Sequence, residues 1–371
     1  MFRLKLIVVA LCLSAFSWAQ AAADDLAWTS DRAALLFYEA MTALQKNALR
    51  PPAPLDEARR AIGAAARGLD EFSAYWPREE YEAFKRAADP SFAGVGMEIW
   101  ADESGAVICI PKPGGPAQKA GVAYGDRLIS VDGKPVAAEA VYAAGAMIRG
   151  QAGSTVRLGL LGQGGRRKNV SIIRAKQAFR TVESTREGGA PRLRISSFTN
   201  NTPAELAEAL GRLGAAKVVV IDLRGNVGGD MFAAMEAAGK LLPVGAPLLT
   251  LRQRGGETAY KNVGRPLNLT SRLFVWQDKR TASAAEVFVA ALTRNKRATS
   301  IGQTSFGKGV AQKIVELSDG SALLVTYAEL IPPGGRAYHG HGLRPDRALA
   351  PGADASDRAY ALATAAAMSA K

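Results

Sequence analysis

The stretch KVVVIDLRGNVGGDMFAAMEAAGKLL, residues 217–242, decides the fold class. Four apolar residues, 218–221, lead into a glycine-rich turn at 225–229, and a segment typical of a helix follows at 231–242. A short and continuously apolar run predicts a strand that is covered on both faces. The stretch therefore indicates one strand–turn–helix unit of an α/β sheet.

The same alternation continues on both sides of this unit. We expect strands at 192–198, 217–223, 273–277 and from 298 onward, and helices at 202–213, 231–242 and 284–294. Strands that alternate with helices predict an α/β layer structure. Residues 177–371 are therefore expected to form one α/β domain with a largely buried sheet.

Two regions with other sequence patterns precede this domain. Residues 24–88 carry apolar side chains at three- and four-residue spacing, broken by RPPAP at 50–54, and predict a helical segment. Residues 89–176 instead contain short stretches typical of β-strands, separated by glycine. The pair Asp132-Gly133 is typical of a hairpin turn. We expect residues 89–176 to form a separate small domain.

The N-terminus carries the pattern of an export signal. Residues 1–23 contain basic Arg3 and Lys5, an apolar stretch at 6–18 and small residues at the end. The apolar stretch is short for a membrane span, so the pattern predicts a cleaved signal peptide, with a retained anchor as the alternative. We therefore expect a periplasmic or secreted protein, and peripheral membrane association is left open.

Composition narrows the chemistry. The chain has 371 residues, with 47 Lys+Arg, 34 Asp+Glu, two histidines and two cysteines. So few histidines and cysteines exclude a cysteine-rich zinc module and leave little room for histidine-based catalysis, and we expect no metal and no cofactor. The net charge of +13 indicates a basic surface, but the sequence offers no basic patch with interleaved aromatic residues, so no nucleic acid is expected as a partner.

Ser283, just before the helix expected at 284–294, is the first candidate for chemistry. Ser283 and Glu286 have the spacing of a capping box, which by itself is the commoner explanation of such a pair. A serine at a helix start is also well placed for nucleophilic attack, because the N–H groups of the first turn and the helix dipole favour a developing oxyanion.

With histidine scarce, a lysine is the candidate base. Lys308 lies between Gly307 and Gly309 among small and apolar neighbours, and a lysine kept neutral by burial can accept a proton. Gln312, four residues on, shares a face with it and could orient its amine. The segment 302–308 also fits the start of a phosphate-binding loop, but Gly309 replaces the Ser or Thr of that motif and a strand is expected to follow.

The glycine-rich turn at 225–229 completes the set of candidates. By itself it is a tight connection between a strand and a helix. Its functional interpretation is that a glycine N–H joins the N–H of Ala284 in binding a tetrahedral oxyanion.

Together these segments resemble the carboxyl-terminal processing (tail-specific) peptidases. The segments that carry the resemblance, in family order, are LDEFSAY at 69–75, FAGVGMEI at 92–99, DLR at 222–224, NVGG at 226–229, ASAAE at 282–286, FGKG at 306–309 with Gln312, and GLRPD at 342–346. Val227 and Thr281 depart from the proline and serine that are usual in the family. The resemblance implies a serine–lysine peptidase core of ClpP/crotonase-like fold with a PDZ domain ahead of it.

Carried over residue by residue, the resemblance assigns the chemistry. Ser283 would be the nucleophile, Lys308 its general base and Gln312 the residue that holds the lysine. Gly229 and Ala284 would supply the oxyanion donors, with a glycine next to Gly229 as the alternative.

The PDZ domain implies recognition of C-terminal tails. Such a domain adds a peptide as a strand and holds its carboxylate with backbone N–H groups of a glycine-containing loop, for which Gly94, Val95, Gly96 and Met97 are the candidates. An ordinary turn into a strand is the alternative. The implied partners are protein or peptide substrates with exposed C-termini, while an envelope adaptor protein and a homo-oligomer are left open.

Three functions fit this organisation. The first is an endopeptidase that cleaves proteins with apolar C-terminal tails through an acyl-enzyme. The second is a non-catalytic scaffold that grips such tails. The third is an enzyme that stays inactive until a partner repositions the PDZ domain.

Overall fold

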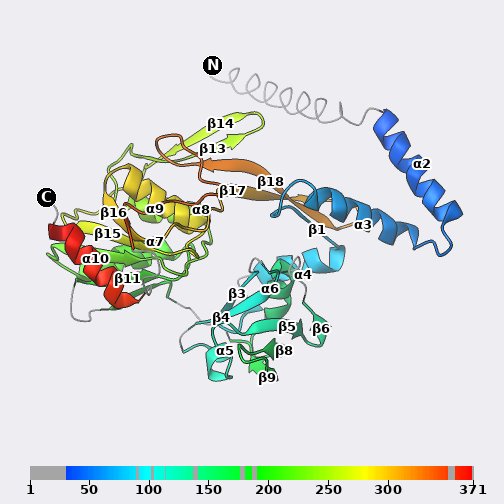
Figure 1. The fold of residues 1–371 in the computed structure, drawn as a ribbon, viewed down its shortest axis with the longest axis horizontal. Helices are drawn as coiled ribbons and strands as arrows, with labels where there is room; N and C mark the ends of the chain where they lie inside the picture. Colours follow the sequence, from blue (N-terminus) through cyan, green and yellow to red (C-terminus); the bar gives the residue numbers. More distant parts are fainter. Residues whose placement is uncertain are drawn as a thin grey trace, which may run out of the picture. The chain divides into compact units, whose positions relative to one another are not determined.

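The computed structural model describes residues 31–88, 92–101, 104–112, 114–136, 141–175, 180–185, 190–349 and 356–369 (Figure 1). The chain divides into two compact units, Met1–Glu71 and Phe72–Lys371. The signal peptide expected at 1–23 lies outside the described residues. Among the helices of the described ranges, none has both the length and the apolar character needed to span a bilayer.

The first unit contains two described helices, α2 (Asp31–Asn47) and α3 (Pro54–Arg67). Pro54 is the first residue of α3, a position where the missing N–H leaves no helical hydrogen bond unmade. Asp56 and Glu57 lie in the first turn, where the helix dipole favours negative charge. The last residue of the proline-rich segment at 50–54 is therefore the first residue of α3.

The second unit begins with a strand that the sequence pattern did not predict. Strand β1 (Ala74–Trp76) lies within the segment expected to be helical and pairs antiparallel with β18 (Ala322–Ile331). Trp76 packs against Phe84 of the helix that follows, α4 (Arg78–Ala88). The expectation of a purely helical segment at 24–88 was wrong here, because three residues are too few to show a strand's periodicity.

A region of short β-strands follows within the same compact unit. Its strands are β2 (Phe92–Ala93), β3 (Met97–Ala101), β4 (Val107–Pro111), β5 (Arg127–Val131), β6 (Lys134–Pro135), β7 (Gly150–Gln151), β8 (Thr155–Leu161) and β9 (Arg167–Ile173), and its helices are α5 (Pro116–Lys119) and α6 (Val141–Ile148). The main sheet has the antiparallel order β3-β4-β5-β8-β9. Asp132 and Gly133, both at positive φ, form the two-residue turn between β5 and β6, which confirms the predicted hairpin.

The α/β core confirms the expected fold class. Its sheet has six strands in the order β10 (Val182–Thr185), β11 (Arg192–Ile195), β12 (Val218–Asp222), β15 (Arg272–Gln277), β16 (Ala298–Gly302) and β19 (Arg347–Ala348). All neighbours are parallel except β10 and β11. Every residue of β15 from Leu273 to Gln277 is buried, because both faces of a parallel sheet are covered.

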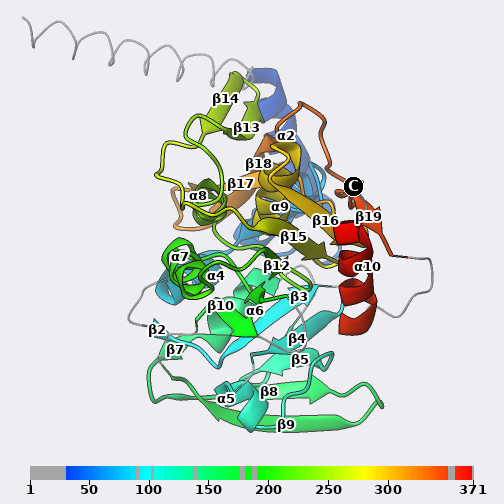
Figure 2. The ribbon, with the colours of Figure 1, turned by 90° about the vertical axis from the view of Figure 1, so that its left-hand side faces the viewer.

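Helices cover the two faces of this sheet. Helices α7 (Thr202–Arg212), α8 (Met231–Gly239) and α9 (Ala284–Arg294) share one hydrophobic cluster, and α10 (Asp357–Ser369) belongs to another. Figure 2 shows α10 on the opposite side of the sheet from α7. Successive strand residues point to opposite faces, so Val219 and Ile221 enter the first cluster and Val220 packs with Tyr360 of α10 in the second.

A second, antiparallel sheet belongs to the same unit. It joins β1 to β18, β13 (Pro247–Gln253) and β14 (Gly256–Lys261) in that order, and β17 (Val310–Glu316) also pairs with β18. The sequence pattern predicted β17 but not the β13–β14 hairpin, since β14 is almost wholly exposed and has no apolar face. Because a strand and not a helix follows Gly309, the phosphate-binding alternative is excluded.

Candidate active site

Ser283 lies at a sharp turn between β15 and α9. Its backbone has φ 55° and ψ −122°, a conformation that residues other than glycine adopt only when their surroundings enforce it. Thr281 is one such support, since its hydroxyl donates to Leu223 O at 3.0 Å and its carbonyl accepts from Phe306 N–H at 2.9 Å. The turn holds Ser283 at the N-terminus of α9, where the N–H groups of Ala285 and Glu286 donate to the carbonyls of Ala282 and Ser283 and that of Ala284 points past the helix end.

The glycine turn packs directly against this serine turn. A Cβ placed on Gly228 would lie 2.9 Å from Ser283 Cβ and 3.0 Å from Ala284 N. Gly228 also has φ +108°, which side-chain-bearing residues rarely adopt. Only glycine therefore allows the two turns to approach this closely.

The two expected oxyanion donors have unengaged N–H groups. On either side of Gly229, the N–H of Gly228 donates to a side-chain amide oxygen and that of Asp230 to a backbone carbonyl. Among the hydrogen bonds of the described residues, none uses the N–H of Gly229 or of Ala284. Both groups can therefore bind an oxygen atom of a ligand, and their role as oxyanion donors stays a prediction.

Asn226 connects the parts around the glycine turn. Its side chain is fully buried, with Oδ1 accepting from Gly228 N–H at 2.8 Å and Nδ2 donating to Ile195 O at 2.9 Å. Its backbone carbonyl accepts from Ala282 N–H at 3.0 Å, one residue before Ser283. The sequence analysis quoted Asn226 only as part of a motif, although a polar residue between a buried strand and a glycine pair was a signal for such a role.

One carboxylate joins Ser283 to the loop that carries Lys308, between β16 and β17. Glu286 Oε2 accepts from the N–H of Ser283 at 2.8 Å and from the N–H of Lys308 at 2.9 Å. Glu286 Oε1 accepts from Gly307 N–H at 2.7 Å and from Ser305 Oγ at 2.5 Å. Because the backbones of Ser283 and Lys308 bind the same oxygen, the two predicted residues are brought together.

Glu286 does more than the capping role that its spacing predicted. Its side chain is fully buried, and burial raises the pKa of its carboxyl while the hydrogen bonds from its four donors oppose that shift. The reciprocal bond to Ser283 N–H is the glutamate half of a capping box. The hydrogen bonds between Glu286 and the loop at 305–308 could not be predicted from the spacing of Ser283 and Glu286. They form because the folded sheet places that loop beside α9.

Gln312 lies on β17, beside a bulge in the pairing of that strand with β18. Its side-chain N–H donates to Thr326 Oγ1 at 3.0 Å, and Thr326 N–H donates to the hydroxyl of Ser73 at 3.1 Å. The preceding residue, Phe72, has its ring centroid 4.7 Å from Lys308 Nζ. Gln312 and Lys308 thus share the neighbourhood of one segment, and the role of Gln312 in holding the lysine stays a prediction.

The candidate carboxylate loop, Gly94–Met97, leads into the edge strand β3. The carbonyls of its two central residues accept from the N–H groups of Ala117, at 2.8 Å, and Lys112, at 2.9 Å. In a trans peptide the C=O and the following N–H point in opposite directions, so the N–H groups of Gly96 and Met97 point away from these partners. The loop therefore presents two donors beside a sheet edge, as the PDZ interpretation requires, although no ligand tests it.

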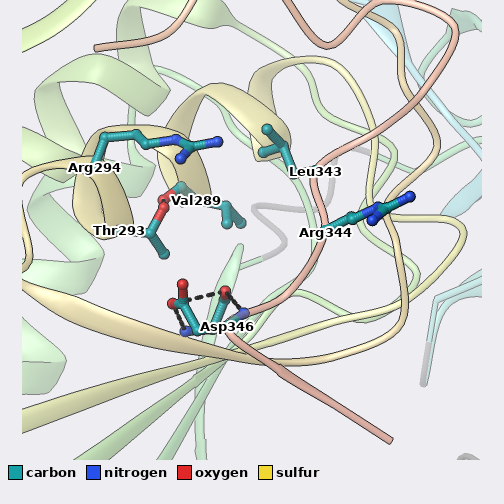
Figure 3. A pocket seen from close by; sticks show the side chains of 7 residues that line it. Val289, Thr293, Arg294, Leu343, Arg344 and Asp346 are labelled. Carbon is teal, nitrogen blue, oxygen red and sulfur yellow. Dashed lines mark hydrogen bonds between the residues drawn. The ribbon is translucent and has the colours of Figure 1, made fainter. Parts of the chain in front are cut away.

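A small cavity beside α9 is separate from this site (Figure 3). Its volume is about 50 Å³, and it is lined by Val289, Thr293, Arg294, Ser300, Leu343, Arg344 and Asp346. Ligand pockets usually measure about 300 Å³ or more, so the cavity is too small to be one. Within the described ranges, no group of three or more His, Cys, Asp or Glu side chains could hold a metal ion.

Comparisons with known sequences point to one family. Residues 192–349 match peptidase family S41, and residues 107–161 match the PDZ domain. The carboxy-terminal processing protease CtpA of Bacillus subtilis (strain 168) is 32% identical over 289 residues, which are 77% of this chain and 62% of that protein. The chloroplastic C-terminal processing peptidase of Tetradesmus obliquus is 31% identical over 323 residues, which are 80% of this chain and 70% of that protein.

A solved structure gives the same result. The photosystem II D1 C-terminal processing protease superposes with a TM-score of 0.66 at 29% sequence identity, over 88% of this chain and 90% of that one. The chain spans less than two thirds of the length of the Bacillus subtilis relative but more than two thirds of the Tetradesmus obliquus relative. The chain therefore belongs to the C-terminal processing peptidases of family S41.

Proposed function

We propose that this chain is a serine endopeptidase that acts through Ser283 and Lys308. The observation that carries the proposal is the shared oxygen of Glu286, which binds the backbone N–H of both residues at 2.8 and 2.9 Å. It joins the backbone of a serine at a helix N-terminus to that of a lysine in a glycine-flanked loop, which supports a serine–lysine mechanism. Family membership supports the same chemistry.

The reaction follows from the positions of these groups. The neutral amine of Lys308 takes the hydroxyl proton of Ser283 while Oγ attacks the scissile carbonyl carbon. The N–H groups of Gly229 and Ala284 stabilise the negative oxygen that develops. Lys308 then protonates the leaving amine as the C–N bond breaks. Water next attacks the acyl carbon and gives a proton to Lys308, which passes a proton to Ser283 Oγ as the bond between Oγ and the acyl carbon breaks. Gln312 keeps the amine oriented during both steps.

The test is cleavage of a protein with an apolar C-terminal tail, followed by mass spectrometry of the fragments. We expect the wild-type chain to produce fragments and both Ser283→Ala and Lys308→Ala to produce none. Thr293→Ala, on α9 but outside the site, is the matched control and should cut normally. Cleavage by Ser283→Ala at the wild-type rate would contradict the proposal, and tail binding without cleavage by the wild type would favour the scaffold.

We propose that substrates are recognised through C-termini that end in small or apolar residues. The N–H groups of Gly96 and Met97, which point away from their domain's carbonyl contacts, would receive the terminal carboxylate, and the free edge of β3 would pair with the peptide. A tail peptide with an amidated C-terminus should bind about tenfold more weakly than the free acid, since it lacks the negative charge. Equal affinities of the two peptides would exclude this recognition mode.

We propose that the protein works in the periplasm or is secreted. The support is the basic, apolar and small-residue pattern of residues 1–23. N-terminal sequencing of protein from fractionated cells should give a chain that begins near residue 22 to 24 in the extracytoplasmic fraction. A chain that still begins at Met1 and sediments with membranes would show instead that the segment is kept as an anchor.

A further inference from the structure

The side chain of Lys308 rests on an aromatic ring from a distant part of the sequence. Its Nζ lies 4.7 Å from the centroid of the Phe72 ring, within the range of a cation–π interaction. We propose that Phe72 is a positioning residue for Lys308, which holds the amine against its ring face. The inference rests on the proposed role of Lys308 as the general base.

Phe72 is held in place by the strand that follows it. Strand β1 pairs with β18 so that Ala74 lies opposite Leu324. The hydroxyl of Ser73, which is 4% exposed, accepts from Thr326 N–H at 3.1 Å. Two anchors directly after Phe72 therefore fix its backbone beside the strand pair that carries Gln312.

A second ring packs on Phe72. The ring centroids of His339 and Phe72 are 5.9 Å apart, with a tilt of 56°. His339 Nδ1 lies 3.2 Å from Gly307 O, and because a carbonyl only accepts, Nδ1 carries a proton and donates. Since Gly307 directly precedes Lys308, the two rings and the loop of the lysine form one cluster.

The electrostatic effect of the Phe72 ring has a definite sign. A ring face attracts a cation and so stabilises the ammonium form of Lys308 over the neutral amine. Replacement of the ring removes this preference, so a reaction that needs the neutral amine should reach its maximal rate at a lower pH. The other titratable groups around the loop are the carboxyl of Glu286 on α9 and the side chains of Tyr338 and His339 after β18. Of these, His339 also contacts the ring of Phe72.

The test is the pH dependence of kcat/KM for a tailed peptide. Phe72→Leu keeps an apolar side chain and removes the ring face. We expect the rising part, or limb, of the profile of kcat/KM against pH to shift to lower pH by about 0.5 to 1 unit. The maximal rate should fall about tenfold, because the amine is held less well. Phe72→Tyr keeps the ring face and should keep the wild-type limb.

A second series changes the ring without changing its shape. Phenylalanines with one, two and three ring fluorines at position 72 weaken the negative face of the ring step by step, so the limb should move down in the same order. This series decides the question if Phe72→Leu does not fold. The profiles are repeated in a His339→Gln background, so that titration of the histidine is not mistaken for that of the lysine.

The control is Phe84→Leu, because Phe84 packs on Trp76 at 4.8 Å in the same unit of the chain. It should lower the thermal stability and leave the limb in place. A limb that stays at the wild-type pH in Phe72→Leu and through the fluorinated series overturns the inference. The proposed function fails by a different result, which is cleavage by Ser283→Ala at the wild-type rate.

Discussion

The two halves of the candidate active site are held by different kinds of contact. Around Ser283 the supports are hydrogen bonds from fully buried polar groups, those of Asn226 and Thr281. On the side of Lys308 the supports include aromatic rings, with Phe72 against the amine and Phe306 against Trp100 of the PDZ domain at 4.9 Å. Buried hydrogen bonds fix one geometry because an unmade bond is costly, whereas a partly exposed ring, such as that of Phe306 at 38% exposure, can exchange its contact. The side of Ser283 is therefore the rigid half, and the side of Lys308 is the half that other segments can adjust.

Glu286 connects the two halves, so its replacement should have the largest effect. In Glu286→Gln one carboxylate oxygen becomes an NH₂ group. That group then faces either the N–H groups of Ser283 and Lys308 or the N–H of Gly307 and the hydroxyl of Ser305. We expect the free energy of unfolding to fall by about 2–3 kcal/mol and kcat/KM to fall about 1,000-fold. Denaturant titration and peptide hydrolysis measure the two effects.

Glu236→Gln is the matched control for this substitution. Glu236 is 60% exposed and pairs with Lys240 one turn along α8, an arrangement that contributes little to stability. It should leave both quantities close to wild type. If Glu286→Gln kept wild-type kcat/KM, the two halves would be held independently and the comparison drawn above would lose its connecting element.

Gly228→Ala should damage the nucleophile half alone. The new Cβ would lie 2.9 Å from both Ala282 O and Ser283 Cβ, at a φ of +108°. Displacement of the turn would remove the oxyanion donor proposed for Gly229, so we expect kcat/KM to fall about 100-fold. The pH limb set by Lys308 should stay where it is, and a limb that moved would show that the halves are not separate. Gly211→Ala, with open space around its Cβ on α7, is the control and should not reduce activity.

The residues of the rigid half could largely be predicted from the sequence. In the adjustable half the sequence indicated Lys308 and Gln312 but not the aromatic contacts around them. Ser283, Ala284 and the glycine turn were found because a buried strand, a tight turn and a helix start are local patterns with a direct chemical meaning. Phe72 was quoted only as part of a motif, since nothing near it in the sequence indicates a contact with Lys308. That contact depends on the pairing of β1 with β18, which no periodicity in three residues could reveal.

The same reasoning explains the errors in the fold. The apolar runs of β12 and β15 predicted the buried sheet correctly, because burial on both faces leaves a continuous apolar signal. The exposed hairpin strand β14 and the alanine-rich helix α10 carry no such signal and were not predicted. The spacing of apolar residues indicates how a segment is buried. Segments in which buried and exposed positions differ little in polarity are therefore missed.

Trp100→Leu tests how far the PDZ domain adjusts the base side. The Trp100 ring meets that of Phe306 edge-on, two residues before Lys308. An aromatic pair of this kind contributes about 0.5–1.5 kcal/mol, so we expect kcat/KM to fall about threefold. The contacts around Ser283 should stay the same. Ile173→Ala, an exposed residue on β9, is the control. A rate that rose would mean that this contact restrains the enzyme until a partner moves the domain.

A charge cluster supports the rigid half from the α10 side. Arg224 donates to the buried carboxylate of Asp222 at 2.6 Å and to Asp357 at the start of α10 at 2.7 Å. Tyr360, one turn along α10, donates to Gln277 O at the end of β15. The helix is thus fastened to the strand that leads into the Ser283 turn.

Acid should weaken the ion pairs that attach α10, and the resulting loss of stability should be small. The hydrogen bonds from Arg192 and Arg224 lower the pKa of Asp357 below its ordinary value of 3.8, so its contribution to stability is complete above that pH and is lost as the pH falls through the folded-state pKa. Because Asp357 is largely exposed, solvent screens the pair, and Asp357→Asn should cost only about 1–2 °C in Tm at pH 6. Between pH 4 and pH 2 the Tm of the wild type should converge on that of the variant. Parallel Tm curves down to pH 2 would show that the ion pair does not fasten α10, and the rigidity of the Ser283 half would then rest on its buried hydrogen bonds alone.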